Sequence, residues 1–520
     1  MAASGATRHH RPPRRGFVVM IRRLRRRTAR AAGAAAVTAV VLPLVACTVG
    51  PDYHRPVAAV APEYKELSGW KVAEPRDTDE RGPWWTAFND PLLDALEQQV
   101  AVSNQTLAAD EAAYRQAVAI ADQARSQLYP ILTANGSVRR ARSGGGSGGF
   151  GSTGIGTSAT GGSVTVFSSG GSDSAQTHYQ PSLSASWDLD VWGRIRRTIE
   201  SDVASAEASA ADLAAAKLSA QAELATDYFQ LRSLDEQKQL FEAAATAYEE
   251  LLRITQNQYQ WGIVPRGDVA QAETQVAATR AQAIAVGIQR AQFEHAIAVL
   301  AGEPPAELTI TPAELGDVPP TPPAGLPSAL LERRPDIAAA ERRVAAANAQ
   351  IGVAMAAYYP DITLTSSVGY ASTALASLFD YSNLAWSVGV AAAQTLFDAG
   401  SRGAELDQAR AALDQAVATY RQTVLSSFQD VEDQLAGLRV LEQQATAQEQ
   451  AVAAARDAER LELNQYKAGT VAYTSVVTAQ QTALSNEQTA LGIRQSQFTS
   501  TVALVRALGG GWPAVAPPPG

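Results

Sequence analysis

The chain contains a single cysteine, Cys47, among its 520 residues, and this scarcity excludes several classes of site. One thiol cannot form an intramolecular disulfide, and it cannot supply the ligands of a thiolate zinc site. Histidine is also rare: after residue 46 only His54, His178 and His295 remain, with no HExxH spacing and no GxSxG motif. We therefore expect no enzymatic activity, no cofactor and no bound metal. GGGSGG at 144–149 fits GxGxxG in form, but no helical pattern follows it.

Long apolar runs are missing too. After residue 46 no stretch of eighteen uncharged apolar residues exists, so we expect no transmembrane helix. The first 46 residues hold ten arginines and no acid; without them 33 basic and 52 acidic residues remain, a net charge of −19. A chain this acidic is a poor candidate for binding nucleic acid.

The segment before Cys47 has the three-part pattern of a secretory signal. A run rich in arginine at 22–30 precedes an apolar stretch at 31–45, which is too short for a comfortable membrane span. Residues 1–46 are therefore predicted to be a signal peptide. Because Met20 opens a more ordinary signal than the first methionine does, residues 1–19 are a candidate start-site artefact.

The four residues LVAC at 44–47 resemble the bacterial lipoprotein box, in which the cysteine becomes the acylated first residue of the mature chain. We therefore expect Cys47 to be a lipid anchor; an ordinary buried cysteine is the alternative. Residue 48 is Thr48 and not an aspartate, which by the same resemblance favours the outer membrane over the inner one.

Two parts of the chain repeat each other at a spacing of 207 residues. YQWGIVP at 259–265 matches YKAGTVA at 466–472, and DVWGR upstream of the first matches FDAGSR upstream of the second. Further upstream, Pro130 and Pro360 are 230 residues apart, so the first copy holds 23 extra residues, which the Gly/Ser-rich loop at 143–176 supplies. Two copies of one unit explain the length better than unrelated domains do.

Each copy contains one very long helical segment. Residues 194–261 contain neither Gly nor Pro, residues 401–468 contain no Pro, and each stretch would span about 100 Å as a helix. The helix-favouring segments 92–129 and 268–301 of the first copy are together about as long as one such helix. We expect them to stack end to end beside it, so that each copy is a helical hairpin that reverses at YQWGIVP or YKAGTV.

Between the short and the long helix, the apolar period changes from 3.6 residues to 2. Apolar residues alternate with Ser and Asp across 182–191, and similar alternation recurs at 362–368, 384–390 and, more weakly, 131–139. Such strands fit the wall of a membrane β-barrel, with a soluble sheet as the alternative. Four strands cannot close a barrel, so several chains must share one; three would supply twelve strands, but composition does not fix the number.

These features together resemble the outer-membrane efflux factors, the channel-tunnel family of TolC and NodT type. The resemblance covers nearly the whole mature sequence. It rests on ACTVGPDYHRP at 46–56, WWTAFNDPLLDAL at 84–96, LLERRPDIAAAERRVAAANAQIGVA at 330–354, FDAGSR at 397–402 and YKAGT at 466–470. It implies an α+β membrane protein of two repeats, each with a long antiparallel helical hairpin and two β-strands. Three chains would form a lipid-anchored homotrimer with a 12-stranded β-barrel and a periplasmic α-barrel.

The function implied is the exit duct of a tripartite efflux pump of RND type, which passes drugs or toxic compounds from the periplasm to the exterior. Its partners would be a periplasmic adaptor, an inner-membrane pump and outer-membrane lipid. A lipid-anchored coiled-coil scaffold, or a duct for protein secretion or metal-ion export, remains the alternative; a scaffold leaves the strands without a purpose.

The predicted organisation follows the repeat. The segments are a signal peptide at 1–46, an anchor and extended segment at 47–90, repeat 1 at 91–302, a Pro-rich connector at 303–327, repeat 2 at 328–510 and a Pro-rich tail at 511–520.

The resemblance also assigns roles at the two reversals. Gly262 and Gly469 match glycines that contact the adaptor in relatives, so adaptor docking is implied there; a glycine needed only for the turn is the alternative. Many relatives carry an Asp at the periplasmic constriction where this chain has Thr478, with Ser475 three residues earlier, so we expect a less acidic constriction. The remaining candidates for the constriction, which could equally be a solvated helix start, are Arg266, Asp268 and Glu273.

Overall fold

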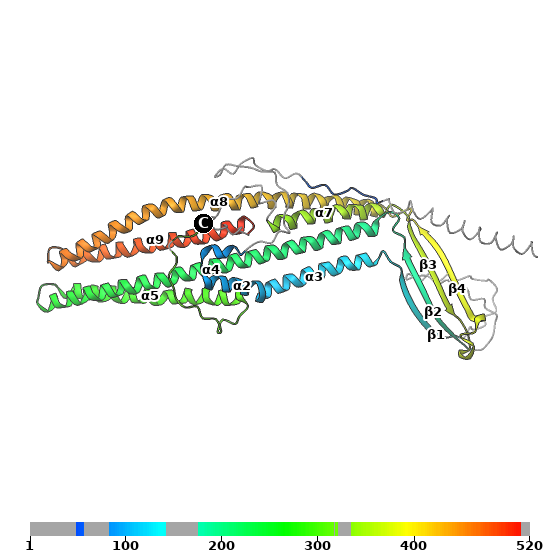
Figure 1. The fold of residues 1–520 in the computed structure, drawn as a ribbon, viewed down its shortest axis with the longest axis horizontal. Coiled ribbons are helices and arrows are strands. Elements are labelled where there is room, and N and C mark those ends of the chain that lie inside the picture. Colours follow the sequence, from blue (N-terminus) through cyan, green and yellow to red (C-terminus); the bar gives the residue numbers. More distant parts are fainter. Residues whose placement is uncertain (1–47, 57–82, 142–174, 317, 321–333, 511–520) are drawn as a thin grey trace, which may run out of the picture. The chain divides into compact units, whose positions relative to one another are not determined.

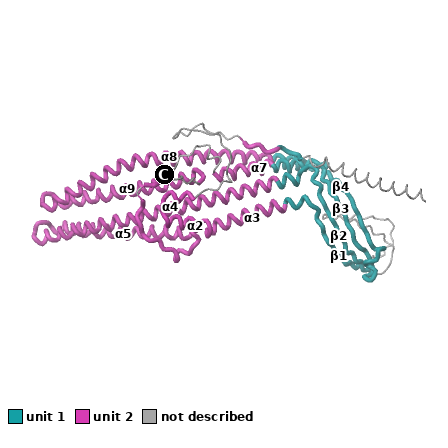
Figure 2. The backbone as a smooth tube through the Cα atoms, in the orientation of Figure 1, with its two compact units in different colours: residues 1–51, 124–199, 349–407 teal, residues 52–123, 200–348, 408–520 magenta. Residues whose placement is uncertain are grey.

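The computed structural model describes residues 48–56, 83–141, 175–316, 318–320 and 334–510. The chain divides into two compact units, which Figure 2 colours separately. Unit 1 contains residues 1–51, 124–199 and 349–407, and unit 2 contains residues 52–123, 200–348 and 408–520. Cys47, most of the Gly/Ser-rich loop and the tail lie outside the described residues, so the predictions for them stay predictions.

Unit 1 is built around one antiparallel sheet of four strands in the order β1-β2-β3-β4 (Figure 1). The strands are β1 (Ile131–Ala141), β2 (Gln176–Asp188), β3 (Asp361–Tyr370) and β4 (Leu384–Ala393). Each repeat therefore contributes two strands, as the alternating pattern predicted. Two short 3-10 helices, Leu375–Ser377 and Tyr381–Asn383, lie between β3 and β4.

The register of the sheet separates an apolar face from a polar one. Leu183 pairs with Val368, which pairs with Trp386, so these side chains share one face. On the other face Ser184 pairs with Ser367, whose hydroxyl oxygen lies 2.9 Å from that of Ser387. The apolar face is open: Trp386 is 74% exposed, and Val388 and Val390 follow it at alternate positions with 66% and 68% exposure.

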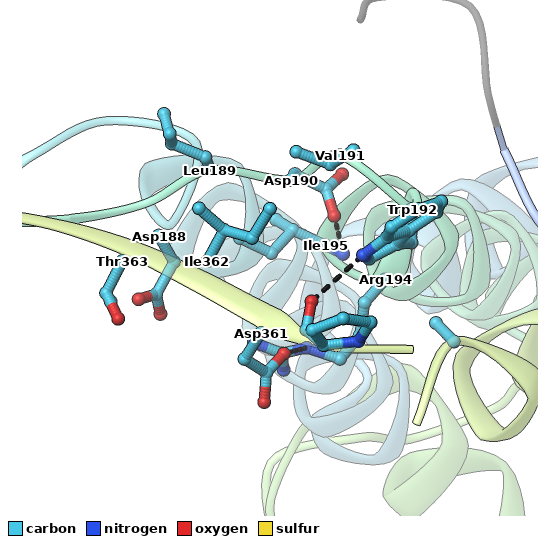
Figure 3. A pocket seen from close by; sticks show the side chains of 12 residues that line it. Asp188, Leu189, Asp190, Val191, Trp192, Arg194, Ile195, Asp361, Ile362 and Thr363 are labelled. Carbon is cyan, nitrogen blue, oxygen red and sulfur yellow. Dashed lines mark hydrogen bonds and ion pairs between the residues drawn. The ribbon is translucent and has the colours of Figure 1, made fainter. Parts of the chain in front are cut away.

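The second strand ends earlier than its alternating pattern suggested. The pattern extends to residue 191, but β2 ends at Asp188 because Asp190 caps the following helix instead. The Asp190 carboxylate accepts hydrogen bonds from the backbone N–H groups of Ile195 (2.9 Å) and Arg196 (3.0 Å). Beside this junction is a pocket of about 260 Å³ (Figure 3), across which the Trp192 indole donates to the Pro360 carbonyl at 2.9 Å. The alternating pattern therefore runs three residues beyond the end of β2.

The long helices are present with nearly the predicted bounds. They are α4 (Arg194–Gln260) and α8 (Ser401–Lys467), each of 67 residues, and their return helices are α5 (Arg266–Ala301) and α9 (Tyr473–Ala507). The α4–α5 and α8–α9 hairpins lie side by side in unit 2, with their reversals at the same end (Figure 1). In the described part of the chain, no helix combines the length and apolar character that crossing a membrane requires.

The single helix predicted at 92–129 is two helices, α2 (Pro91–Ser103) and α3 (Gln105–Ser126). Asn104 separates them with an extended backbone, φ −65° and ψ 121°. Its side-chain oxygen accepts the N–H groups of Thr106 and Leu107, and its amide donates to the Leu300 carbonyl at 2.8 Å. Asparagine is more favourable at the start of a helix, where its side chain caps free N–H groups, than in a helix interior. The helix-forming tendency of the segment as a whole did not reveal this break. In the second repeat the corresponding short helix is α7 (Pro335–Ala356).

The largest core cluster of unit 2 is rich in aromatic residues. The short helix η2 (Trp84–Phe88) places Phe88 4.8 Å from Phe229 of α4, and Phe498 of α9 lies 4.8 Å from Phe229 on centroid distances. Helix α2 packs on the same cluster through Leu93. The core thus joins helices of both repeats.

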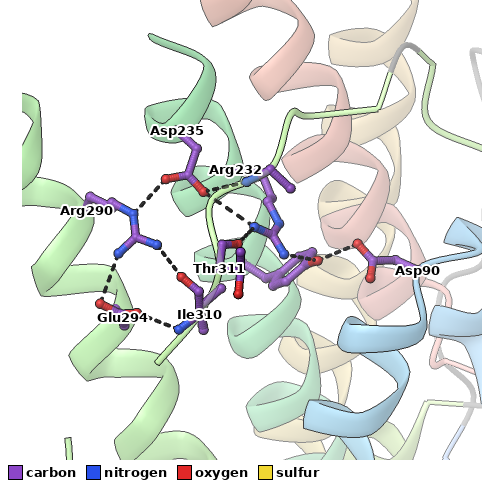
Figure 4. Close-up of polar contacts among 9 residues, drawn as sticks. Asp90, Arg232, Asp235, Arg290, Glu294, Ile310 and Thr311 are labelled. Atoms are coloured by element: carbon purple, nitrogen blue, oxygen red, sulfur yellow. Dashed lines mark hydrogen bonds and ion pairs between the residues drawn. The ribbon is translucent and has the colours of Figure 1, made fainter. Parts of the chain in front are cut away.

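Beside this core, a polar network fixes the first part of the connector (Figure 4). Arg290 pairs with Asp235 at 2.6 Å and with Glu294 at 3.0 Å, and it donates to the Ile310 carbonyl at 2.5 Å. Arg232 donates to the Thr311 carbonyl at 2.7 Å. Buried charges of both signs therefore satisfy one another and the connector backbone.

Candidate functional site

Both hairpin reversals have the same backbone geometry. Gly262 and Gly469 have φ values of +71° and +75°, a region that glycine enters without a Cβ penalty. Gly262 N–H donates to Tyr259 at 2.9 Å and Ile263 N–H to Gln258 at 2.9 Å, which is the Schellman pattern of helix ends. The second reversal repeats both bonds at 2.9 and 3.0 Å, 207 residues later. The turn therefore requires both glycines.

The two reversals differ in what surrounds the glycine. At the first, Tyr259, Trp261 and Ile263 are 45%, 83% and 67% exposed, so three large apolar side chains face solvent within five residues. The repeat offset places the buried Tyr466 (3% exposed), Ala468 and Thr470 at these positions in the second. A Cβ atom on either glycine would meet nothing within 4 Å. Both tips thus have free space, but only the first presents a large apolar patch.

Just above the tips, the two hairpins are joined by residues that the sequence analysis did not single out as a site. The hydroxyl oxygens of Thr255 in α4 and Tyr466 in α8 are 3.1 Å apart in a buried contact. Tyr466 packs edge-to-face on Tyr473 of α9, with ring centroids 5.8 Å apart. Leu251 and Ala272 from the first hairpin complete this cluster. Tyr259 and Tyr466 are related by the repeat, but the first is exposed and the second is buried. Their matching motifs did not predict this difference.

The charged candidates from the first tip fall into two groups. Arg266 and Glu273 form an exposed ion pair on α5 at 3.3 Å. Asp268 lies in the first turn of α5. The pKa of Tyr473 is raised to about 12, chiefly by burial, with added contributions from the charges of Tyr466 and Asp268. Asp268 is therefore the member of this set whose charge acts on a residue of the second hairpin.

Ser475 and Thr478 are exposed and lie one turn apart on α9. The Thr478 hydroxyl donates to the Thr474 carbonyl at 2.9 Å, within its own helix. In the described part of the chain, no hydrogen bond or ion pair joins either residue to Arg266 or Glu273. The assignment of these residues to a constriction therefore stays a prediction.

A cavity of about 650 Å³ lies between α4, α8 and α9, at residues that the sequence analysis passed over. Glu223 and Asp227 line it from α4, and Arg506 lines it from α9. The pKa of Asp227 is raised to about 6 by burial and by the neighbouring charge of Glu223. Metal ligation is a separate question: no set of three or more His, Cys, Asp or Glu side chains in the described ranges could hold an ion.

Comparison with known proteins identifies the family. The outer membrane efflux protein family matches residues 96–303 and 326–510. The probable efflux pump outer membrane protein TtgC of Pseudomonas putida is 33% identical over 90% of this chain and 93% of its own. The cation efflux system protein CusC of Escherichia coli is 30% identical over 91% and 97%.

Solved structures agree with these relatives. The outer-membrane channel OprN superposes with a TM-score of 0.78 at 30% identity, covering 90% of this chain and all of that one. The structure of CusC gives 0.77 at 26% identity over 89% of this chain and all of its own. Two helical hairpins and a four-stranded sheet are thus a fold that this chain shares with outer-membrane channels. The chain belongs to the outer membrane efflux protein family and serves as the outer-membrane exit duct of an efflux pump.

Proposed function

We propose that three copies of the chain close one twelve-stranded barrel, which carries small molecules from the periplasm to the exterior as a passive duct without catalytic chemistry. The observation that carries this proposal is the sheet of unit 1. Its apolar face is exposed, and its outer strands β1 and β4 each have one edge without a partner strand in the described residues. Lipid tolerates neither open edges nor unpaired backbone groups, whereas pairing β4 of one copy with β1 of the next satisfies both edges.

The tips around Gly262 and Gly469 are, in this proposal, where a periplasmic adaptor docks. Each long helix extends for 67 residues, about 100 Å, before it reaches its tip. Space around both glycines is free, so a helical hairpin of the partner can approach the backbone closely. Two tips in each of three chains present six docking positions to the adaptor, which connects the duct to an inner-membrane pump.

The anchor and the cargo complete the proposal. Cys47 carries acyl chains as the first residue of the mature protein, in keeping with its lipoprotein box. The names of relatives refer to cargoes as different as toluene, pyoverdine and cations, so a duct of this fold accommodates many chemistries. We propose that this duct passes drugs or toxic compounds, with the choice made by the inner-membrane pump.

The duct itself is tested by purification and electrical recording. Detergent-extracted protein should run as a heat-resistant trimer and conduct ions in a planar bilayer. A stable monomer without conductance would refute the shared barrel and favour a coiled-coil scaffold.

Docking is tested on the glycines. Gly262→Arg and Gly469→Arg should abolish drug export and adaptor crosslinking while trimers still reach the outer membrane. Full export with normal crosslinking would refute docking at the tips, and loss of the trimer would show that the glycines serve only the turn.

A further inference from the structure

The segment that follows Cys47 lies against the start of α4. Val49 N–H donates to the Trp192 carbonyl at 3.1 Å. The guanidinium of Arg197, in the first turn of α4, donates to the Val49 carbonyl at 3.3 Å and to the Gly50 carbonyl at 3.2 Å. Arg197 is only 4% exposed. Burying the Arg197 cation costs free energy unless hydrogen bonds compensate it. Its bonds to two consecutive carbonyls therefore indicate a specific binding position for this backbone segment, which we call the seat.

Three glycines make room for that seat. A Cβ atom on Gly50, whose φ is +108°, would lie 2.5 Å from the Cα of Gly352 in α7. A Cβ on Gly352 would lie 2.8 Å from the Arg197 Cγ, and one on Gly193 would lie 2.9 Å from the Thr48 Cγ2. Real Cβ atoms do not come so close, so the segment and its seat fit only because side chains are missing at these three positions.

A second set of contacts fixes the same segment a few residues later, within unit 2. The Tyr53 hydroxyl donates to Glu341 at 3.3 Å, and Arg55 pairs with the same carboxylate at 3.4 Å. The Tyr53 ring packs on a cluster that includes Val344 of α7 and Tyr420 of α8. The residues from Thr48 to Arg55 are therefore held at both ends by buried partners.

We infer that residues 48–55 form a fixed strap, and that the seat made by Gly193, Arg197 and Gly352 is a positioning site for the lipid anchor. The inference rests on the proposed acylation of Cys47. Neighbouring Cα atoms are 3.8 Å apart, so holding Thr48 on Gly193 confines the acylated residue to the start of α4. The acyl chains then enter the membrane at one place beside the sheet, which a loose tether would not achieve. Arg197 acts here as a positioning residue.

Chymotrypsin cleavage after Tyr53 reports whether the strap is seated. Purified full-length trimers are treated with the protease, and the released fragment that ends at Tyr53 is followed by mass spectrometry. The wild-type protein should resist cleavage, because Tyr53 is held in its cluster. Gly352→Val and Arg197→Ala should release the fragment at least about tenfold faster, with the heat stability of the trimer unchanged. Gly492→Val is the matched control, since a Cβ there meets nothing within 4 Å.

Arg197→Lys provides a second variant in case Gly352→Val does not fold. It keeps the charge but loses the fork that reaches two carbonyls, so its cleavage rate should lie between those of the wild type and Arg197→Ala. Equal cleavage of all variants, or equally fast cleavage of Gly492→Val, would overturn the strap. The mass of the fragment decides acylation separately: a bare Cys47 would contradict the anchor, while the cleavage rates still decide the seat.

Discussion

The hydroxyl oxygens of Thr255 and Tyr466 lie 3.1 Å apart, although 211 residues separate them in the chain. The Thr255 hydroxyl also donates to the Leu251 carbonyl at 2.9 Å, so its proton is engaged and Tyr466 is the donor in the pair. This single buried bond joins the α4–α5 hairpin of the first repeat to the α8–α9 hairpin of the second. It is thus a direct polar link between the two repeats near the tips.

Thr255→Val should loosen this link while keeping the shape of the side chain. It leaves the buried Tyr466 hydroxyl without an acceptor, at a cost of about 1–3 kcal/mol. Hydrogen exchange of amides in 463–477 should therefore accelerate by about fivefold or more. Tyr466→Phe should have a smaller effect, because the Thr255 hydroxyl keeps its bond to Leu251, and unchanged exchange in both variants would contradict the link.

Glu97 predicts a pH dependence of stability. Its side chain is fully buried in α2, and neither carboxylate oxygen has a hydrogen-bond partner in the described part of the chain. Burial, with a smaller contribution from Asp94, raises its pKa to about 9 from the ordinary 4.5. The folded state therefore keeps a proton that the unfolded state releases above pH 4.5. Stability should fall by about 1.4 kcal/mol per protomer and pH unit, at most, as the pH rises from about 4.5 to about 9.

Glu97→Gln should remove that slope, because an amide of similar size does not titrate. Denaturant unfolding midpoints measured between pH 5 and 9 provide the test, with the exposed Glu449→Gln as the control. Glu97→Gln should be more stable than the wild type at pH 8.5 and similar to it at pH 5. Parallel pH profiles for the two proteins would contradict a protonated Glu97.

The sequence predicted the secondary structure and the repeat better than it predicted the contacts between them. Alternation located four strands and glycine spacing located both long helices, because these signals are local. The break at Asn104 and the end of β2 at Asp188 depend on side-chain capping, which a helix or strand period does not report. Glu97 lies on the same face of α2 as Leu93 and Val100. Helix periodicity therefore predicts that its side chain points toward the core, but it does not predict that the carboxylate lacks a hydrogen-bond partner there.

The candidate site shows the same limit. Matching motifs identified both tips, yet they assigned Tyr259 and Tyr466 the same position although one is exposed and the other is buried between hairpins. The partner of Tyr466 lies 211 residues away, and no local pattern specifies such a pair. The sequence did not predict the seat at Gly352 either, because the seat forms only when two distant glycines and Arg197 meet in the folded chain.

Arg290 and Arg280 offer a matched comparison of a buried and an exposed ion pair on α5. Arg290 is 16% exposed and holds Asp235, Glu294 and the Ile310 carbonyl, whereas Arg280 is 60% exposed and pairs with Glu249 at 2.7 Å. Arg290→Ala should destabilise the fold by about 3 kcal/mol and speed amide exchange at 308–313. Arg280→Ala should cost less than about 1 kcal/mol. Equal losses in thermal unfolding would show that the network does not hold the connector.

Thr478→Asp should make the duct more selective for cations. Thr478 is exposed near the second tip, and three copies would add a ring of three carboxylates where hydroxyls now stand. Single-channel recording should then show a stronger preference for cations or block by divalent ions. Thr489→Asp, farther from the tip on the same helix, is the control. Identical selectivity of Thr478→Asp and the wild type would place the constriction elsewhere.

Ile263 and Trp261 should make the first tip the stronger of the two adaptor contacts. They are 67% and 83% exposed beside Gly262, whereas the second tip carries Ala468 and Thr470 at the matching positions. Large apolar side chains that become buried on binding contribute most of the energy of an interface, so Trp261→Ala should cost at least about 1 kcal/mol of adaptor binding.

Ile263→Ala should weaken adaptor crosslinking, and Ile284→Ala is its matched control, because Ile284 is 77% exposed on α5 away from the tip. Both variants remove the same three carbon atoms from a solvent-facing side chain, so only their positions distinguish them. Crosslinking yield and drug susceptibility are measured together with the yield of trimers. A loss confined to Ile263→Ala and Trp261→Ala locates the apolar contact at the first tip. Equal binding by all three variants would mean that the adaptor reads the backbone around the glycines, and that the exposed patch contributes nothing to docking.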